Sequence, residues 1–303
     1  MKIAFLFPGQ GAQCVGMGKD FYAAYPSVKA YYDAFPYRDV CFEGPKEKLD
    51  DTFYTQSCLL VTSLSIAQAL KEEGIQADMA AGLSLGEYTA LTYAGVFSFS
   101  DAVHIVSKRG ELMANALEKG KTKMVAILGG DAQEIEEVCQ TVSTPTEICT
   151  IANRNCPGQL VISGHNAAVD KACALLKEHC RRMVPLQVSG AFHSPLLKEA
   201  GKKLDRELKK VEIKNCQIPV VFNVSGQVET ENFRDSLVKQ IQSTVYMQKS
   251  IETMLEAGVD HFVCIGPGRS MAGFVKKINR QIPVITVEKV EDIEKVKEWI
   301  HGE

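Results

Sequence analysis

The sequence lacks any long apolar run. Its N-terminal apolar segment, residues 3–7, stops at Pro8-Gly9. A secretory signal needs an apolar core of roughly 7 to 15 residues and a membrane span needs about 20, so we expect neither. Charge of one sign is also scarce, because 34 Lys and Arg stand against 37 Asp and Glu, for a net charge of −3. This balance gives no electrostatic reason to bind nucleic acid or an anionic membrane.

Cysteine pairs of the metal-binding kind are absent as well. None of the ten cysteines forms a C-x-x-C pair or has zinc-finger spacing to two histidines, so the sequence predicts no metal site. A secreted chain with many thiols is typically a short disulfide scaffold, whereas this chain has 303 residues. We therefore expect reduced cysteines and a cytoplasmic protein.

The composition is that of an ordinary globular protein, with 46% hydrophobic and 23% charged residues. The length of 303 residues is enough for about two domains. Short apolar strands alternate with amphipathic helices, which predicts an open α/β sheet. The predicted elements before residue 124 are strands 3–7 and 79–83 and helices 57–73, 87–94 and 101–117, the last capped by Ser100.

The middle of the chain has a different order, β-α-β-β-α-β, which is the split βαβ or ferredoxin-like arrangement. Its predicted strands are 124–128, 147–153, 159–163 and 182–188, with helices 134–141 and 167–179. The α/β pattern then resumes with helices 195–208, 233–241 and 250–256 and strands 220–223 and 261–265. We therefore predict that residues 124–191 are an inserted small domain, with a cleft between it and the rest.

Residues 82–86 read Gly-Leu-Ser-Leu-Gly between a predicted strand and a predicted helix. In this context G-x-S-x-G forms a nucleophile elbow, a strained turn that exposes the serine hydroxyl and needs small neighbours. The alternative is an ordinary serine in a turn, where the G-x-S-x-G pattern occurs by chance. The strand before and the helix after favour the interpretation of Ser84 as a nucleophile.

A serine nucleophile needs a base and an oxyanion hole. His193 lies on a loop between a strand and a helix and is the candidate base, the alternative being a surface histidine. No acid stands out between Ser84 and His193, which favours a dyad. The amides of Leu85, at a helix start, and of Gln10, in a glycine loop, are candidate oxyanion donors.

Arg109 interrupts the apolar stripe of its helix, four residues after Ile105 and three before Leu112. A guanidinium facing the core needs an anionic partner, either a fixed protein carboxylate or a substrate carboxylate held bidentately. Both readings stay open, although the proximity of this helix to the one that Ser84 opens favours a substrate.

Together these residues resemble the malonyl-CoA:acyl carrier protein transacylases, the stand-alone acyltransferases of type II fatty acid synthesis, and the chain is also similar to acyltransferase domains of polyketide synthases. The matching motifs run from end to end: FPGQGAQ at 7–13, TQ at 55–56, GLSLGEY at 82–88, KRGELM at 108–113, NRNCPGQ at 153–159, GAFHSPL at 190–196 and GPG at 266–268. The resemblance implies an α/β-hydrolase-like catalytic subdomain, residues 1–123 and 192–303, with a ferredoxin-like subdomain, residues 124–191, inserted in it.

The resemblance also implies the roles of the site residues. Ser84 carries the malonyl group as an ester, His193 is the general base, and the main-chain carbonyl of Gln240 orients that histidine. Arg109 binds the malonyl carboxylate.

The remaining implied site residues surround this dyad. Gln10 and Leu85 form the oxyanion hole, and Gln56 matches an active-site glutamine of the family. Phe192 resembles malonyl-preferring members, in which a bulky ring leaves little room for an α-methyl branch.

Malonyl-CoA and a phosphopantetheinylated acyl carrier protein are the implied substrates, with coenzyme A as carrier and no further cofactor or metal. Because carrier proteins are acidic, we expect a basic docking face. Residues 177–214 carry ten Lys and Arg against five Asp and Glu, although a merely solvated helix face is the alternative. Nothing demands more than a monomer, which is the expected state.

Two departures from the family pattern stand out. Position 83 is Leu where the family often has His, and residues 243–247 read Ser-Thr-Val-Tyr-Met where the family often has Asn-Pro-Val-x-Trp. Two other functions remain open: an acyltransferase or editing acyl hydrolase of a polyketide pathway, and a catalytically silent carrier-protein binding module.

Overall fold

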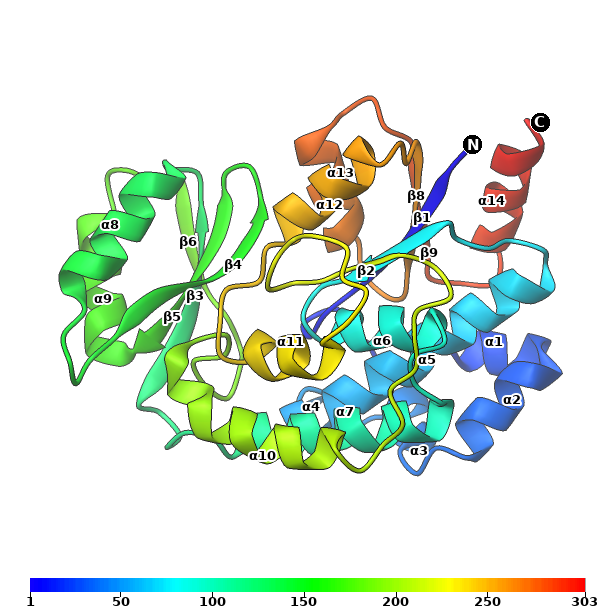
Figure 1. Cartoon of the computed structure of the whole chain (residues 1–303), viewed down its shortest axis with the longest axis horizontal. Coiled ribbons are helices and arrows are strands. Elements are labelled where there is room, and N and C mark those ends of the chain that lie inside the picture. The colour runs from blue at the N-terminus through cyan, green and yellow to red at the C-terminus, as the bar shows by residue number, and fades with distance from the viewer. Residues whose placement is uncertain (303) are drawn as a thin grey trace.

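The larger of two β-sheets forms the centre of the molecule in the computed structural model, which describes residues 1–302 (Figure 1). Its strand order is β7-β2-β1-β8-β9, and every neighbouring pair is parallel. The strands are β1 (Ile3–Phe7), β2 (Met79–Gly82), β7 (Val220–Val221), β8 (His261–Ile265) and β9 (Val284–Val287). Strands β1 and β2 are buried along their whole length, which explains their continuous apolar sequences. The predicted α/β class is confirmed.

The smaller sheet lies on the left of Figure 1, where it packs against helices α8 and α9. Its order is β4-β5-β3-β6, all antiparallel, which is the ferredoxin-like topology predicted from the βαββαβ order. The elements are β3 (Thr122–Leu128), α8 (Ala132–Val142), β4 (Cys149–Cys156), β5 (Gln159–His165), α9 (Asn166–Leu175) and β6 (Arg182–Pro185). The domain boundaries at residues 124 and 191 stay a prediction.

Helices cover the larger sheet, and the longest of them, α5, is buried for most of its length, with Thr and Ser side chains among its buried residues. These helices are α5 (Thr52–Glu72), α6 (Leu85–Tyr93), α7 (Phe99–Ala114), α10 (Lys198–Leu208), α11 (Phe233–Gln240), α12 (Met247–Glu256), α13 (Ser270–Ile278) and α14 (Asp292–His301). A 3₁₀ turn, η1 (Pro195–Leu197), precedes α10. Across residues 1–302, no helix has the length and apolar character that a membrane crossing requires.

The predicted cap of α7 is wrong. Ser98, rather than Ser100, precedes the helix: its backbone is extended and its hydroxyl accepts a hydrogen bond from the Asp101 amide at 3.1 Å. The Asp101 carboxylate in turn accepts from the Ser98 hydroxyl at 2.7 Å. The Ser98 hydroxyl thus satisfies one of the free amides of the first turn, as an N-cap does, and the helix starts at Phe99.

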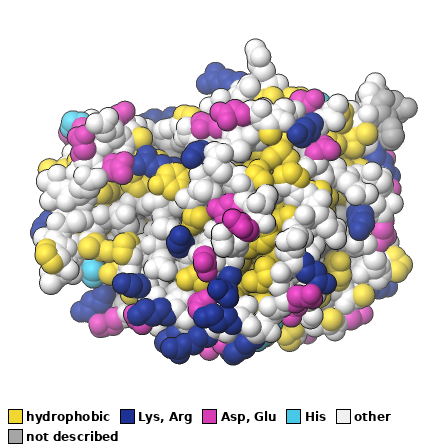
Figure 2. Space-filling view, viewed as in Figure 1, with side chains coloured by type: hydrophobic (Ala, Val, Ile, Leu, Met, Phe, Trp, Pro, Cys, Tyr) yellow, Lys and Arg dark blue, Asp and Glu magenta, His cyan; other side chains and the backbone are white. Residues whose placement is uncertain are grey.

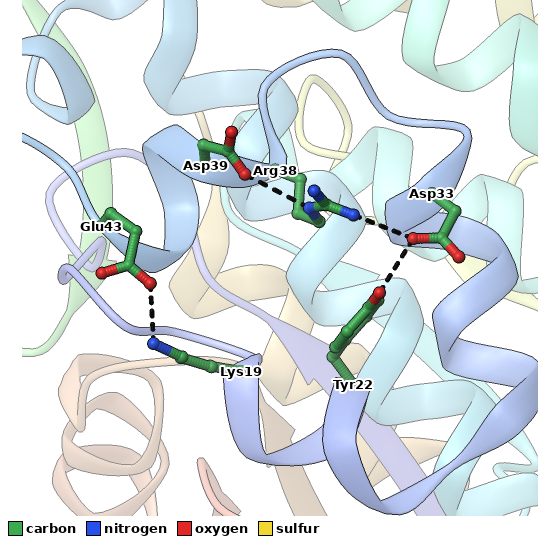
Figure 3. Close-up of polar contacts among 6 residues, drawn as sticks. All are labelled: Lys19, Tyr22, Asp33, Arg38, Asp39 and Glu43. Atoms are coloured by element: carbon green, nitrogen blue, oxygen red, sulfur yellow. Dashed lines mark hydrogen bonds and ion pairs between the residues drawn. The ribbon is translucent and has the colours of Figure 1, made fainter.

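Four short helices between residues 19 and 49 were not predicted: α1 (Lys19–Ala24), α2 (Pro26–Asp33), α3 (Arg38–Phe42) and α4 (Lys46–Leu49). Helices α1, α3 and α4 have four to six residues and are too short to show a helical period, and the eight-residue α2 buries only Val28 and Tyr32, so its apolar stripe is narrow. Burial of Tyr32 and Phe42 holds them in place. Exposed polar contacts add little stability; Figure 3 shows those of Lys19 with Glu43 at 2.7 Å, Tyr22 with Asp33 at 3.0 Å, and Arg38 with Asp33 at 3.0 Å and Asp39 at 3.3 Å.

Candidate active site

The candidate site lies where the carboxyl ends of β1, β2 and β8 meet. In a parallel sheet this edge is the usual place for ligands, because the loops that follow adjacent strands converge there. The loop after β1, the turn after β2 and the Pro267-Gly268 loop after β8 line one cleft. The opposite wall comes from the smaller sheet and includes Met124 and Val161. Residues distant in sequence therefore face each other across the cleft between the two sheets.

Ser84 occupies a sharp turn between β2 and α6. Its φ of 54° and ψ of −104° are strained for a residue with a side chain, as in a nucleophile elbow. A Cβ atom on Gly82 would lie 2.0 Å from the backbone of Gly86, and one on Gly86 would lie 2.2 Å from the Phe7 carbonyl oxygen. Both glycines of the motif are therefore required by close backbone approach.

His193 is next to Ser84 in space although 109 residues separate them in sequence. Its Nε2 lies 2.7 Å from the Ser84 Oγ, and its Nδ1 lies 2.7 Å from the Gln240 carbonyl oxygen. A carbonyl can only accept, so the proton resides on Nδ1 and leaves Nε2 free to accept from the serine hydroxyl. Burial and the charge of Arg109 lower the pKa of His193 to about 4, against the opposing hydrogen bond to Gln240. The imidazole is therefore neutral near pH 7, as a general base must be.

Arg109 of α7 is fully buried. Its Nη1 donates to the Gln56 Oε1 at 2.5 Å, and its Nη2 donates to the Gln240 Oε1 at 2.8 Å and to the Ser84 Oγ at 3.0 Å. The guanidinium also lies 5.3 Å from the centre of the Tyr88 ring. All of these partners are uncharged. The buried carboxyl group of Glu87 is close enough to influence Arg109, but within residues 1–302 no carboxylate forms a hydrogen bond or ion pair with the guanidinium. A buried cation without a counter-ion is costly, which favours binding of an anion beside Ser84.

The other predicted site residues also line the cleft. Leu85 is the first residue of α6, and Gln10 lies in the loop after β1, where its side chain donates to the Thr52 hydroxyl at 2.9 Å. Phe192 is buried at the cleft wall and its carbonyl accepts from the Ser163 hydroxyl at 2.8 Å. The structure thus brings all eight predicted residues together, and the roles assigned to them stay predictions.

Asn223, which the sequence analysis did not single out, contacts the elbow from the other side. Its Oδ1 accepts from the Ser84 amide at 2.7 Å, and its Nδ2 donates to the Gly82 carbonyl at 2.7 Å. The sequence does contain a signal for Asn223: this polar residue follows the buried strand β7, at the edge of the sheet where ligands usually bind. No cluster of three His, Cys, Asp or Glu side chains suited to a metal ion occurs in the described part of the chain.

Comparisons with known proteins identify relatives over nearly the whole chain. Residues 4–301 match the family model of the acyl transferase domain. The chain is 44% identical over 302 residues to the malonyl CoA-acyl carrier protein transacylase of Bacillus subtilis, covering 97% of this chain and 95% of the relative. The crystal structure of the malonyl CoA-acyl carrier protein transacylase from Clostridium perfringens has a TM-score of 0.96 at 38% identity, covering 100% of this chain and 98% of that one.

A further solved structure, a type II polyketide synthase acyl-carrier protein in complex with its malonyl-transacylase, has a TM-score of 0.94 at 34% identity and covers 98% of this chain and 99% of that one. These matches extend over the whole α/β sheet, the ferredoxin-like sheet and the cleft between them. The chain therefore belongs to the acyl transferase family, and within it to the malonyl CoA-acyl carrier protein transacylases.

Proposed function

We propose that the chain transfers the malonyl group of malonyl-CoA to the phosphopantetheine thiol of an acyl carrier protein, through a malonyl ester on Ser84. One observation carries this proposal: the Ser84 Oγ lies 2.7 Å from the His193 Nε2 and 3.0 Å from the Arg109 Nη2. A nucleophile placed between a neutral base and a buried cation selects a short acyl group whose far end carries a negative charge.

In the first half-reaction the Ser84 Oγ attacks the thioester carbonyl carbon while its proton passes to the His193 Nε2. The amides of Gln10 and Leu85 donate to the developing oxyanion. The carbon–sulfur bond then breaks, and the departing sulfur of coenzyme A takes the proton from His193. The malonyl group remains as an ester on Ser84.

The second half-reaction reverses these steps, with the carrier-protein thiol giving its proton to His193 and attacking the ester. Because one thioester is exchanged for another, the overall driving force is near zero, and selectivity comes from binding the malonyl carboxylate and keeping water from the ester. Gln56 and Gln240 orient the Arg109 guanidinium with uncharged oxygens and therefore leave its charge to the substrate. The ring of Phe192 narrows the cleft against an α-methyl branch.

The proposed chemistry needs no cofactor, because coenzyme A only carries the substrate, and it needs one copy of the chain, because Ser84 and His193 belong to the same chain. We propose a monomer on these grounds, and a cytoplasmic location because all ten cysteines are unpaired, as is typical of a reducing compartment. Residues 1–123 and 192–303 would form its catalytic subdomain, and residues 124–191 the inserted one.

We propose that the acidic carrier protein docks on α10 and α11. Figure 2 shows dark-blue side chains gathered along the lower edge of the molecule, where Figure 1 places α10. The shallow groove between the two helices is lined by the cations Lys202, Arg206, Lys209, Arg234 and Lys239 and the anions Asp205 and Asp235. Lys202 pairs with Glu199 at 2.7 Å, and Lys209 with Asp205 at 2.6 Å. Exposed ion pairs of this kind are weak, so carboxylates of a bound carrier protein can replace Glu199 and Asp205 as partners of these lysines.

Reversal of charge on this face gives a direct test. In the double variant Lys202→Glu, Lys203→Glu we expect the KM for carrier protein to rise by about 10-fold, since several exposed charge contacts are lost at once. The KM for malonyl-CoA stays unchanged. The matched control is Lys295→Glu, Lys297→Glu on α14, which Figure 1 places on the opposite side of the molecule. An equal rise in both KM values, or the same rise in the control, would contradict docking on this face.

Product analysis tests the proposed reaction itself. The protein is incubated with malonyl-CoA and a phosphopantetheinylated carrier protein, and the products are separated by mass spectrometry. We expect malonyl carrier protein and free coenzyme A in equal amounts. Free malonate as the main product would instead indicate an editing acyl hydrolase, and the absence of any reaction would indicate a carrier-protein binding module.

A further inference from the structure

We propose that Glu87 and Asn223 are positioning residues for the nucleophile, and that Glu87 acts as a neutral carboxylic acid, which leaves the charge of Arg109 to the substrate. This inference rests on the proposed function. Its basis is a chain of buried hydrogen bonds that begins on α6, one turn after Ser84, passes through the loop after β7, and returns to both sides of Ser84.

The Asn223 side chain clamps the elbow at two points. Its Oδ1 accepts from the Ser84 amide and its Nδ2 donates to the Gly82 carbonyl, both at 2.7 Å. The Gln240 Nε2 donates to the Ser84 carbonyl at 2.7 Å and adds a third contact. Because Ser84 has an unfavourable φ of 54°, its conformation persists only where surrounding contacts enforce it. Asn223 is fully buried and supplies two of those contacts.

Glu87 in turn fixes the main chain of Asn223. Its Oε2 accepts from the Asn223 amide at 2.5 Å. Strand β7 ends at Val221, so the Asn223 amide has no strand partner and depends on this carboxyl group. The hydrogen bonds therefore run from Glu87 to Asn223 and from Asn223 to Ser84.

Several features indicate that Glu87 is protonated at pH 7. Its side chain is fully buried, and its Oε1 has no hydrogen-bond partner within residues 1–302. The charged and titratable groups that face it are Arg109 of α7, Tyr88 of α6 and Glu229 in the loop after β7. Burial raises the pKa of Glu87 to about 8, and Glu229 adds to the rise, whereas the Asn223 amide, Arg109 and Gln240 oppose it.

The neutral state has a consequence for substrate binding. An ionised Glu87 would compensate the charge of Arg109 and weaken its attraction for the malonyl carboxylate. As an acid, Glu87 still accepts from the Asn223 amide but contributes no charge. Above about pH 8 the protein should therefore bind its anionic substrate less well, because Glu87 becomes ionised.

Three variants test this inference. We expect Glu87→Ala and Asn223→Ala each to lower kcat by about 100-fold, the scale of a small displacement of reacting groups, with little change in the KM for malonyl-CoA at pH 7. Glu87→Gln, which keeps an acceptor for the Asn223 amide, should restore most of the loss. It should also abolish the fall of kcat/KM that we expect for the wild type above about pH 8.

Glu229→Gln is a matched control variant that keeps Glu87. Removing the charge of Glu229 lowers the pKa of Glu87, so the fall of kcat/KM at alkaline pH should begin at lower pH. Circular dichroism and thermal unfolding establish that each variant is folded. The proposed function is tested separately, by detecting the malonyl ester on the wild type by intact-protein mass spectrometry. If the wild type forms the ester but Glu87→Gln is as slow as Glu87→Ala, or keeps the alkaline fall, the inference is overturned.

Discussion

Replacing Ser84 with alanine is expected to abolish the covalent malonyl ester and to lower transfer by about 10⁶-fold, the scale seen when the nucleophile of a Ser-His site is removed. In the proposed mechanism the Oγ is the only protein atom that bonds to the acyl carbon, and among the described residues its hydroxyl is the one that contacts the His193 Nε2, at 2.7 Å. Intact-protein mass spectrometry after mixing with malonyl-CoA measures the ester directly. The wild type should gain a malonyl-sized adduct, with little labelling from acetyl-CoA.

Ser27→Ala provides the control, because this serine is on α2 and is not among the residues that line the cleft. It should acquire the malonyl adduct as the wild type does. A malonyl adduct that persists in Ser84→Ala would show that the elbow has been misassigned. Equal labelling of the wild type by acetyl-CoA would show instead that Arg109 does not select a carboxylate.

The second large effect concerns Arg109. In Arg109→Ala we expect kcat/KM for malonyl-CoA to fall by about 100- to 1000-fold, because a buried charge-assisted bidentate pair is lost. Transfer of an acetyl group, which has no carboxylate, should fall far less. The preference for malonyl over acetyl is therefore the quantity to measure. Arg109→Lys should recover only part of it, since an ammonium group cannot reproduce the planar fork.

The same variant should change the acid limb of the pH profile. The charge of Arg109 is one of the two causes that hold the pKa of His193 at about 4, the other and larger being burial. Because only the neutral imidazole is a base, activity is lost as pH falls through this pKa. Removing the cation raises the pKa, so the acid limb of kcat/KM for acetyl-CoA should move to higher pH in Arg109→Ala. A limb that stays in place would mean that Arg109 does not act on His193.

Much of the fold could be predicted from short stretches of sequence, because the underlying physics is local. The apolar run 3–7 and the strand 79–83 were recognised since strands buried on both faces need no polar positions. The β-α-β-β-α-β order identified the ferredoxin-like sheet for a similar reason, as each element is long enough to show its period. Helices α1, α3 and α4 were missed because they span too few residues to show a period, and α2 was missed because it buries only Val28 and Tyr32.

Some residues of the candidate site could likewise be predicted from local sequence, and others could not. Ser84 and Arg109 were visible as sequence signals, one in a G-x-S-x-G turn and the other as a cation within an apolar helical stripe. The partner of His193 has no such signal, because it is a main-chain carbonyl, which every residue possesses. Its position at Gln240 was implied only by the family resemblance.

Local spacing and periodicity in the sequence thus mark the residues that could react: the serine of the turn, the candidate base and the guanidinium in the apolar stripe. Their protonation states and contacts depend on the fold. It placed His193 against Ser84 across 109 residues, buried it so that it is neutral at pH 7, and surrounded Arg109 with uncharged amides. It also brought Asn223 and Glu87 behind the elbow. Burial and contact between distant residues set these pKa values and conformations, and neither quantity exists until the chain has folded.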